Sequence, residues 1–513
     1  MGARRLMSAP NAGPHVLAID QGTTGSTCLV IAADGRVAGR AYREITQHYP
    51  RPGWVEHDPV EILDRTLEAA REAVAAAGVV PAAIGVTNQR ETVVVWERDR
   101  PRAAPRAIVW QDRRTAPTCL ALAPHADRVA ATTGLTLDPY FSATKLEWLL
   151  RTHDWVARAR RRDVLVGTID SWLIWNLTRG RVFATDPTNA SRTSLYDIGS
   201  AVWSEPMCQL FGVPLEALPE VRPSAGDFGA VDAQLVGGPA GHSIPIAGVA
   251  GDQQAALFGH GCCTPGEGKN TYGTGAFLLL YTGQNRPAPG GGLVTTVACD
   301  ACGRAGYALE ASIFVAGAAV QWLRDGLGIL DRASETEMLA RSVESTDGVV
   351  FVPALTGLGA PHWEPRARGT IVGLTRGTTH AHLARAALEA MAYSTHDVLT
   401  TMNRQAAPGL AAFERLRVDG GASQNDWLMQ FQADVLGVPV ERPEMVEATA
   451  LGAAGLAGIA TGIWSDVAAF VGQRPIRRFV PGPGREAAHA GKRDWARAVD
   501  TTLHWARSGS TTS

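Results

Sequence analysis

The chain has 513 residues, of which 45% are hydrophobic and 19% charged. It is too long for one ordinary hydrophobic core, so two or more domains are expected in a soluble globular protein. A formal net charge of −2 at pH 7 excludes the strongly basic surface that binding to nucleic acid or to anionic membranes requires.

The cysteines and the amino-terminal residues indicate the cellular compartment of the protein. Seven cysteines are scattered along the chain, which favours a reducing, cytoplasmic setting. Cys299 and Cys302 have no second C-x-x-C pair, so we expect no metal or redox role for them. No apolar run reaches the roughly 18 residues that cross a bilayer, so membrane insertion is not expected. Residues 1–14 are basic but lack an apolar signal core, and we expect a disordered tail.

The first patterned segment covers residues 15–31 and has two β-type runs around a Gly/Thr turn. This pattern predicts a β-hairpin. Backbone N–H groups in such a turn form an anion site and threonine hydroxyls add donors, so Thr23 and Thr24 suit a phosphate. Asp20, at the end of the first strand, suits Mg²⁺, a hard cation that binds one or two carboxylates. An ordinary hairpin turn is the alternative.

Strand and helix patterns then alternate along the first half of the chain. Asp58 suits the N-cap of a helix that continues to residue 77, with proline at its first position. Strands are predicted at 83–87, 92–96 and 164–167, and helices at 144–150 and 170–177. This interleaving predicts an α/β architecture with helix-covered sheets.

A β-type run at residues 243–249 leads into a Gly-rich turn that contains Asp252. A small-residue helical run follows at 254–259, so little side-chain bulk surrounds this carboxylate. An acceptor held at a strand end suits a general base that takes a proton from an attacking alcohol. Gly-Asp is also common in turns and at helix N-caps, and this alternative remains open.

The second half repeats the design of the first. Residues 270–281 form another hairpin pattern, with Gly273 and Thr274 in its turn. Two such hairpins at equivalent places predict two related α/β domains whose turns hold a polyphosphate from both sides. The Gly/Pro-rich stretch 259–267 is the expected boundary. No Walker-type G-x-x-x-x-G-K-[ST] sequence is present.

Later segments extend this alternation. Helices are predicted near 316–327, 380–402, 424–436 and 448–461, a surface loop at 287–292, and partial disorder beyond Trp505. Adjacent glycines at 420 and 421 follow a β-type run and let a flat adenine or a phosphate approach the backbone. Asn425 suits contact with the base or capping of the following helix, and both interpretations can hold together.

Several motifs have the order and spacing of a known family. They begin at Asp20 (DQGTT), Thr87 (TNQRET), Ile108 (IVWQ), Asp138 (DPYF), Gly251 (GDQQAALF), Asn270 (NTYGTG), Phe351 (FVPALTGLGAP) and Val418 (VDGGA). Over about residues 15 to 500 the chain resembles the glycerol kinases of the FGGY family of carbohydrate kinases. The resemblance implies two ribonuclease-H-like domains, as in actin and Hsp70, with the active-site cleft between them. It implies an N-terminal domain at 15–260 on the glycerol and phosphate side, a C-terminal domain at 261–500 on the nucleotide side, and a tail at 501–513.

The resemblance also implies an activity and a site. The activity is in-line transfer of a phosphoryl group from ATP to glycerol, giving sn-glycerol 3-phosphate, with Mg²⁺ as cofactor and Asp252 as general base. Implied contacts to glycerol are Arg90, Glu91, Trp110, Tyr140, Asp252, Gln253 and Phe277. Implied contacts to ATP are Thr23, Thr24, Gly273, Thr274, Gly317, Gln321, Gly421 and Asn425. The implied metal-associated residues are Asp20 and Asp252. A homodimer or homotetramer is expected.

The chain departs from the family pattern at two places. Thr27 stands where the family often has a basic residue, so we expect weaker ATP binding. Ser243 stands where some members have an arginine that binds fructose-1,6-bisphosphate through a charge-assisted fork. Residues 236–241 lack the phosphorylatable histidine of other members, and His242 is not interpreted as its equivalent. We expect insensitivity to both controls.

Two other functions compete with this hypothesis. The nearer is a kinase of the same family that acts on another polyol or sugar, such as xylulose, erythritol or dihydroxyacetone. The other is a nucleotide switch of the actin or Hsp70 kind, which would leave Asp252, Arg90 and Glu91 without a role. Dependence of ATP turnover on an added polyol separates the switch from the kinases.

Overall fold

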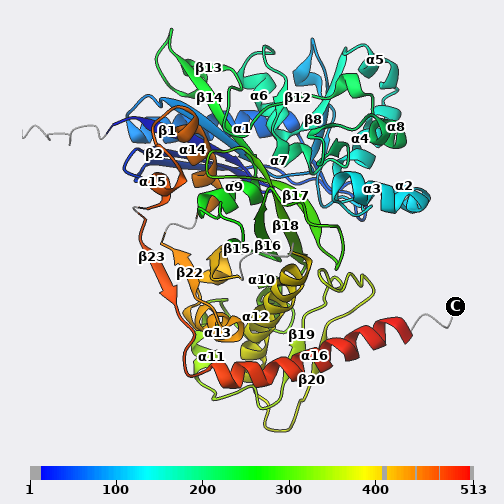
Figure 1. The fold of residues 1–513 in the computed structure, drawn as a ribbon, viewed down its shortest axis with the longest axis vertical. Coiled ribbons are helices and arrows are strands. Elements are labelled where there is room, and N and C mark those ends of the chain that lie inside the picture. Colours follow the sequence, from blue (N-terminus) through cyan, green and yellow to red (C-terminus); the bar gives the residue numbers. More distant parts are fainter. Residues whose placement is uncertain (1–12, 407–412, 445–446, 473, 509–513) are drawn as a thin grey trace, which may run out of the picture.

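The computed structural model describes residues 13–406, 413–444, 447–472 and 474–508. Within these ranges the chain forms two lobes, one above the other along the longest axis (Figure 1), and each lobe contains a large mixed sheet. The predicted amino-terminal tail lies, up to residue 12, outside the described residues. None of the helices in these ranges is long and apolar enough to cross a membrane.

The upper lobe is built on a six-stranded sheet with the order β13-β14-β5-β1-β2-β3. The first three strands in sequence form an antiparallel meander, and β5 and β14 extend it in parallel with β1. The strands are β1 (His15–Gln21), β2 (Gly25–Ala32), β3 (Val37–Glu44), β5 (Ala83–Asn88), β13 (Ala230–Asp232) and β14 (Ser243–Gly251).

The lower lobe is built on a seven-stranded sheet with the order β17-β18-β16-β15-β21-β22-β23. Its run β18-β16-β15-β21-β22 repeats the order and directions of β3-β2-β1-β5-β14. The strands are β15 (Gly268–Tyr272), β16 (Ala276–Gly283), β17 (Val294–Cys299), β18 (Ala305–Ile313), β21 (Leu416–Asp419), β22 (Val440–Pro443) and β23 (Ile476–Phe479). Two sheets of one design confirm the expected pair of ribonuclease-H-like units.

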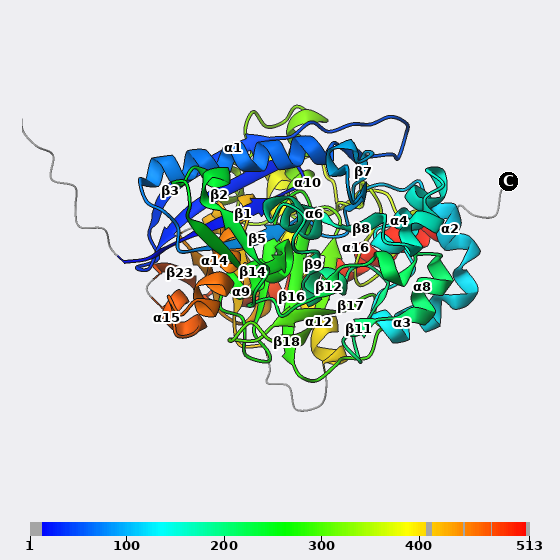
Figure 2. The same ribbon diagram turned by 90° about the horizontal axis from the view of Figure 1, so that it is seen from above.

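Helices cover both faces of the first sheet. Successive side chains of a strand point to opposite faces, so Leu17 and Ile19 pack with α1 (Pro59–Ala77) and α6 (Ile169–Leu177). Val16 and Ala18 pack instead with α14 (Ala448–Ala460) on the other face. Figure 2 shows α1 and α14 on opposite sides of β1 and β2.

Helix α14 belongs to the last part of the chain but lies in the upper lobe, orange beside the blue β1 and β2 in Figure 1. Its approach depends on glycine: a Cβ on Gly85 would lie 2.1 Å from the carbonyl oxygen of Ala453, and one on Gly452 would lie 1.8 Å from that of Ala255. Ala255 belongs to α9 (Asp252–Gly259), which also packs through Leu257 on the second sheet. Helix α9 therefore lies between the two sheets.

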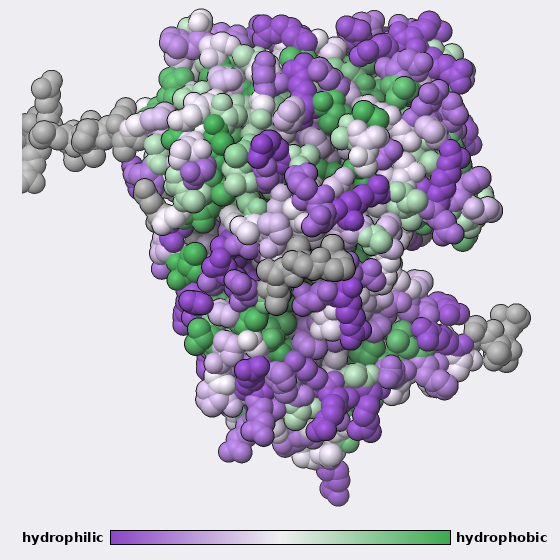
Figure 3. All heavy atoms as spheres, in the orientation of Figure 1, coloured by the Kyte–Doolittle hydropathy of each residue, from purple (hydrophilic) through white to green (hydrophobic). Residues whose placement is uncertain are grey.

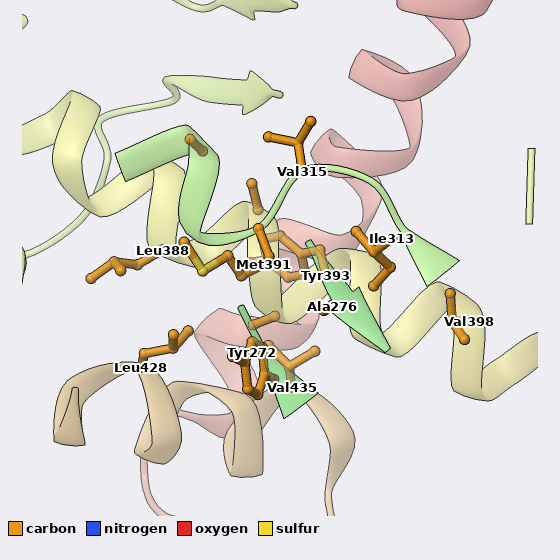
Figure 4. Packing of buried hydrophobic residues seen from close by; sticks show 14 of the residues in the cluster. Tyr272, Ala276, Ile313, Val315, Leu388, Met391, Tyr393, Val398, Leu428 and Val435 are labelled. Atoms are coloured by element: carbon orange, nitrogen blue, oxygen red, sulfur yellow. The ribbon is translucent and has the colours of Figure 1, made fainter. Parts of the chain in front are cut away.

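The core of the lower lobe lies between its sheet and four helices. These are α10 (Gly317–Asp325), α12 (His380–Gln405), α13 (Asp426–Leu436) and α16 (Arg485–Ser508). Figure 4 shows Tyr272 and Ala276 of the sheet beside Leu388 and Met391 of α12 and Leu428 of α13. The predicted helices near 316, 380, 424 and 448 correspond to α10, α12, α13 and α14.

The chain end differs from the prediction of a disordered segment past Trp505. Helix α16 continues to Ser508, because Trp495, Val499, Leu503 and Ala506 recur at helical spacing and are buried. Trp505 lies on the opposite, exposed face of this helix. The predicted tail from residue 501 is thus helical to residue 508, and its remainder lies outside the described residues.

Smaller elements complete the two lobes. A four-stranded sheet in the upper lobe has the order β4-β7-β6-β8. Its strands are β4 (Glu56–His57), β6 (Val93–Glu97), β7 (Ala107–Ile108) and β8 (Val164–Thr168). The other helices are α2 (Ala116–Ala121), α3 (Ala126–Thr133), α4 (Ser142–Thr152), α5 (Val156–Arg160), α7 (Pro187–Ala190), α8 (Glu205–Phe211), α11 (Glu335–Arg341) and α15 (Val467–Val471). The two-stranded sheets are formed by β9 (Ala184–Thr185) with β12 (Glu220–Val221), β10 (Tyr196–Asp197) with β11 (Val202–Trp203), and β19 (Val350–Val352) with β20 (Thr370–Val372). Figure 3 shows hydrophilic residues over most of one face and an indented outline between the lobes.

Candidate active site

Asp252 is the first residue of α9, directly after the last residue of β14. The N-cap is Gly251, so the alternative that Asp252 serves as a helix cap is wrong. Its Oδ1 accepts the backbone N–H of Gln253 at 2.7 Å and lies 3.0 Å from Arg90 Nε. Its Oδ2 has only a long contact, 3.5 Å, from Gln253 Nε2. The side chain is 30% exposed, and Oδ2 is the carboxylate oxygen without a short hydrogen bond.

Arg90 is held rigidly beside this carboxylate. Its two terminal nitrogens donate to the two carboxylate oxygens of Glu310 at 2.6 and 2.8 Å, and Nη1 also donates to Gln254 Oε1 at 3.2 Å. Burial alone would lower the pKa of Arg90, but Glu310 and Glu91 raise it well above its ordinary value. Arg90 is therefore a permanent cation with a fixed orientation toward Asp252.

Glu91 and Arg192 complete a buried network of four charges. Arg192 donates to Glu91 Oε1 at 2.6 Å and to Glu310 Oε1 at 3.1 Å. Glu91 has a left-handed backbone with φ of 61°, which a residue with a side chain adopts only under constraint. Burial raises the pKa of Glu91, whereas Arg192 and Arg90 overcome burial at Glu310 and hold its pKa at about 2. Because Glu310 belongs to β18, the network joins the two sheets.

The predicted aromatic residues are only partly assembled. Trp110 and Tyr140 pack edge to face with ring centroids 5.7 Å apart. Trp110 Nε1 also donates to Thr23 Oγ1 at 2.9 Å, so this ring pair contacts the first hairpin turn. Phe277 lies on β16 opposite Thr271, and in the described part of the chain it has no ring contact with Trp110 or Tyr140.

The first hairpin turn is closed by a bond from Gly22 N–H to the Gly25 carbonyl at 2.8 Å. Gln47 donates to the carbonyl of Thr23 at 2.6 Å, and Thr24 is exposed. Asp20 precedes this turn, and burial, with the negative charge of Asp252 as second cause, raises the pKa of Asp20 to about 7. Asp20 and Asp252 are therefore close enough to repel each other.

The second hairpin turn opens onto a cavity of about 390 Å³. All six predicted nucleotide contacts in the second half of the chain line it: Gly273, Thr274, Gly317, Gln321, Gly421 and Asn425. A Cβ on Gly317 would lie 2.6 Å from the carbonyl oxygen of Gly273, whereas a Cβ on Gly421 would meet nothing within 4 Å. Glycine is therefore needed for packing at 317 and leaves space for a ligand at 421.

Asn425 caps α13. Its Oδ1 accepts the backbone N–H of Leu428 at 2.9 Å, and its Nδ2 donates to Thr336 Oγ1 at 3.3 Å. The capping interpretation is thus confirmed. Contact with a base remains a prediction, because Asn425 also lines the cavity.

Three charged residues of the site region were missed from the sequence: Glu310, Arg192 and Lys269. A signal existed for two of them. Glu310 is a lone acid in the apolar run of β18, and Lys269 is a lone base in β15, directly before the second turn. A charged residue in a buried central strand needs a buried partner. Arg192 follows a short helix and carried no comparable signal.

Comparisons with known proteins agree with this architecture. Residues 15–259 match the N-terminal domain of the FGGY family of carbohydrate kinases, and residues 268–461 match its C-terminal domain. A glycerol kinase of Thermus brockianus is 53% identical, over 96% of this chain and 100% of that protein. One of Aromatoleum aromaticum is 52% identical, over 96% and 99%.

Solved structures give the same result. Plasmodium falciparum glycerol kinase with ADP is 34% identical with a TM-score of 0.89, covering 97% of this chain and 99% of that one. A xylulose kinase from Rhodospirillum rubrum is 25% identical with a TM-score of 0.84, over 96% and 100%. The chain therefore belongs to the FGGY family of carbohydrate kinases, and within it to the glycerol kinases.

Proposed function

We propose that the protein transfers the γ-phosphoryl group of ATP to glycerol, giving sn-glycerol 3-phosphate, with Asp252 as the general base. The observation that carries this proposal is the asymmetric environment of the Asp252 carboxylate. Arg90 and a backbone N–H fix Oδ1, while Oδ2 keeps spare acceptor capacity on a partly exposed side chain. Such an oxygen suits the removal of a proton from a hydroxyl that attacks in line.

The remaining site residues suit positioning. Phosphoryl transfer needs little covalent help, and most catalysis comes from alignment and charge stabilisation. We propose that Arg90, Glu91 and Gln253 hold the glycerol hydroxyls, while Trp110, Tyr140 and Phe277 cover the carbon atoms. Thr23 and Thr24 of the first turn and Gly273 and Thr274 of the second then contact the phosphates from two sides. Gly317, Gln321, Gly421 and Asn425 line the cavity for the nucleotide.

The carboxylates present fit a phosphate-bound Mg²⁺. Among the described residues, no group of three or more His, Cys, Asp or Glu forms a metal cage, and Mg²⁺ in such enzymes binds one or two carboxylates together with substrate phosphates. Asp20 and Asp252 would hold it, and their mutual repulsion favours a cation there. When bound, Mg²⁺ supplies neutralisation of phosphate charge.

The larger organisation is also a proposal. We assign residues 15–260 to the glycerol and phosphate side and 261–500 to the nucleotide side, with α14 returning to the first sheet. Closure of such lobes on both substrates excludes water that would otherwise accept the phosphoryl group. A homodimer or homotetramer in the cytoplasm remains our expectation, and all seven cysteines are free thiols.

The test of the activity is ADP release with Mg·ATP in the presence of glycerol, dihydroxyacetone, erythritol, xylulose or no acceptor. Release that depends on glycerol, with glycerol 3-phosphate formed, is the expected result. Preference for a longer polyol would be consistent with the proposed phosphoryl transfer but would reject glycerol as the substrate. Equal release without an acceptor would indicate the nucleotide switch instead.

The test of the base is Asp252→Asn. Since the amide cannot take the proton, kcat should fall by about 100-fold or more, while glycerol binding measured by calorimetry is largely retained. Asp127→Asn, at an exposed position of α3, is the matched control. Near-normal turnover of the Asp252 variant would reject the assignment.

A further inference from the structure

Lys269 is a fully buried cation that none of the proposed steps uses. It is the second residue of β15, and its side chain has no exposed surface. Its Nζ donates to Gln253 Oε1 and, at 2.7 Å, to Thr271 Oγ1. Within the described part of the chain, no carboxylate lies within ion-pair distance of this nitrogen. A buried ammonium paired only with neutral groups is costly to the fold, so packing alone does not account for it.

Two carboxylates at longer range keep the lysine charged. Burial lowers the pKa of Lys269 to about 8, while Asp419 and Asp252 oppose this decrease. The side chain is thus mainly an ammonium at neutral pH, and it lies near the reacting carboxylate without pairing with it.

The ammonium restricts the orientation of Gln253. A carboxamide has one accepting oxygen and one donating NH₂ group, whereas an ammonium only donates. Gln253 must therefore turn Oε1 to Lys269, and its NH₂ group then points to the other side. There Nε2 lies 3.5 Å from Asp252 Oδ2, the oxygen left free by Arg90.

We propose that Lys269 is a positioning residue that fixes the Gln253 carboxamide with its N–H groups toward the acceptor hydroxyl beside Asp252. This inference rests on the proposed function and deepens it. Gln253 then presents only hydrogen-bond donors to glycerol. This complements Asp252 Oδ2, which can only accept a hydrogen bond. Strand β15 continues into the second turn at Gly273. The same lysine therefore also connects the Gln253 carboxamide to the strand that leads to the proposed phosphate contacts.

A double-mutant cycle tests this coupling. The variants are Lys269→Met, Gln253→Ala and the double variant, with glycerol KM, ATP KM and kcat measured for each. Each single change should raise glycerol KM by about tenfold, and the double variant should be no worse than Gln253→Ala alone. Multiplied effects in the double variant would reject the proposal. An increase confined to ATP KM would instead indicate a direct phosphate contact.

Gln253→Glu covers the case in which Lys269→Met does not fold. A glutamate gives the buried ammonium a counter-charge, so the melting temperature should not fall, but it removes the donor, so glycerol KM should still rise. An unchanged glycerol KM would overturn the proposal. Lys492→Met, in α16 of the lower lobe, is the matched control. Absence of glycerol-dependent turnover in the unmodified protein would reject the proposed function itself, independently of the variants.

Discussion

At the residue scale, four buried side chains of alternating charge determine the geometry of the candidate active site. Arg90, Glu310, Arg192 and Glu91 each have at least one oppositely charged neighbour in the network. Removal of one member of a buried pair leaves the other uncompensated, which typically destabilises a protein by about 3–5 kcal/mol. The orientation of Arg90 toward Asp252 therefore depends on Glu310, although Glu310 belongs to the other sheet.

Thr27 gives a prediction at the same scale. It lies directly opposite Asp20 in the antiparallel pair β1–β2, so both side chains emerge on one face beside the first turn. In Thr27→Arg, a guanidinium would reach that turn and bind phosphate by charge-assisted hydrogen bonds. We expect ATP KM to fall by roughly three- to tenfold at saturating glycerol. Thr27→Gln adds length without charge and is the control; an unchanged or higher ATP KM in the arginine variant would contradict the idea.

At the element scale, α9 packs closely between α14 and the second sheet. In Gly452→Ala, the new Cβ would lie 1.8 Å from the backbone oxygen of Ala255, so α9 and α14 must move apart. Overpacking of this kind destabilises by about 1–3 kcal/mol. Because Asp252 begins α9, we expect both the melting temperature and kcat to decrease.

The control for this prediction is Gly377→Ala, at an exposed position where the nearest atom to a new Cβ is 3.7 Å away. Thermal unfolding and steady-state turnover are measured on both variants. A Gly452→Ala protein with unchanged kcat would show that α9 does not transmit the displacement to Asp252.

The local elements could be predicted from the sequence, whereas the way they pack together could not. Both hairpins, the strand before Asp252 and α1 with its Asp58 cap are local patterns, and each is present. Glu310 is 220 positions from Arg90 along the chain, and no periodicity reports a contact at that distance. Similarly, the small-residue pattern of α14 predicted a helix but not the sheet on which it packs.

At the scale of the whole molecule, a neutral histidine links stability to pH. His57 is fully buried; its Nε2 lies 2.8 Å from Gln47 Oε1, and its Nδ1 lies 3.4 Å from Gln89 Nε2. Gln47 in turn supports the carbonyl of Thr23. Burial, with His48 as second cause, lowers the pKa of His57 to about 4, so this network requires the uncharged ring.

The unfolded chain binds a proton at His57 near the ordinary histidine pKa of about 6.5, whereas the folded chain does not. The free energy of unfolding should therefore decrease as pH falls from about 6.5 to about 4, by on the order of 3 kcal/mol from this group. Urea unfolding at several pH values measures it. His57→Gln should flatten the profile in that window, and His125→Gln, at an exposed position, should leave it steep. A profile equally steep in both variants would assign the effect to other groups.

The position of α14 has a consequence for how the protein is made. During synthesis the strands β1, β5 and β14 leave the ribosome long before residue 460, so one face of their sheet stays uncovered until α14 emerges. Until then helix α9, which begins with Asp252, also lacks its packing partner α14. Activity must accordingly await the synthesis of α14. A chimaera of two relatives joined near residue 260 would keep a native first sheet only if α14 came from the same parent as that sheet.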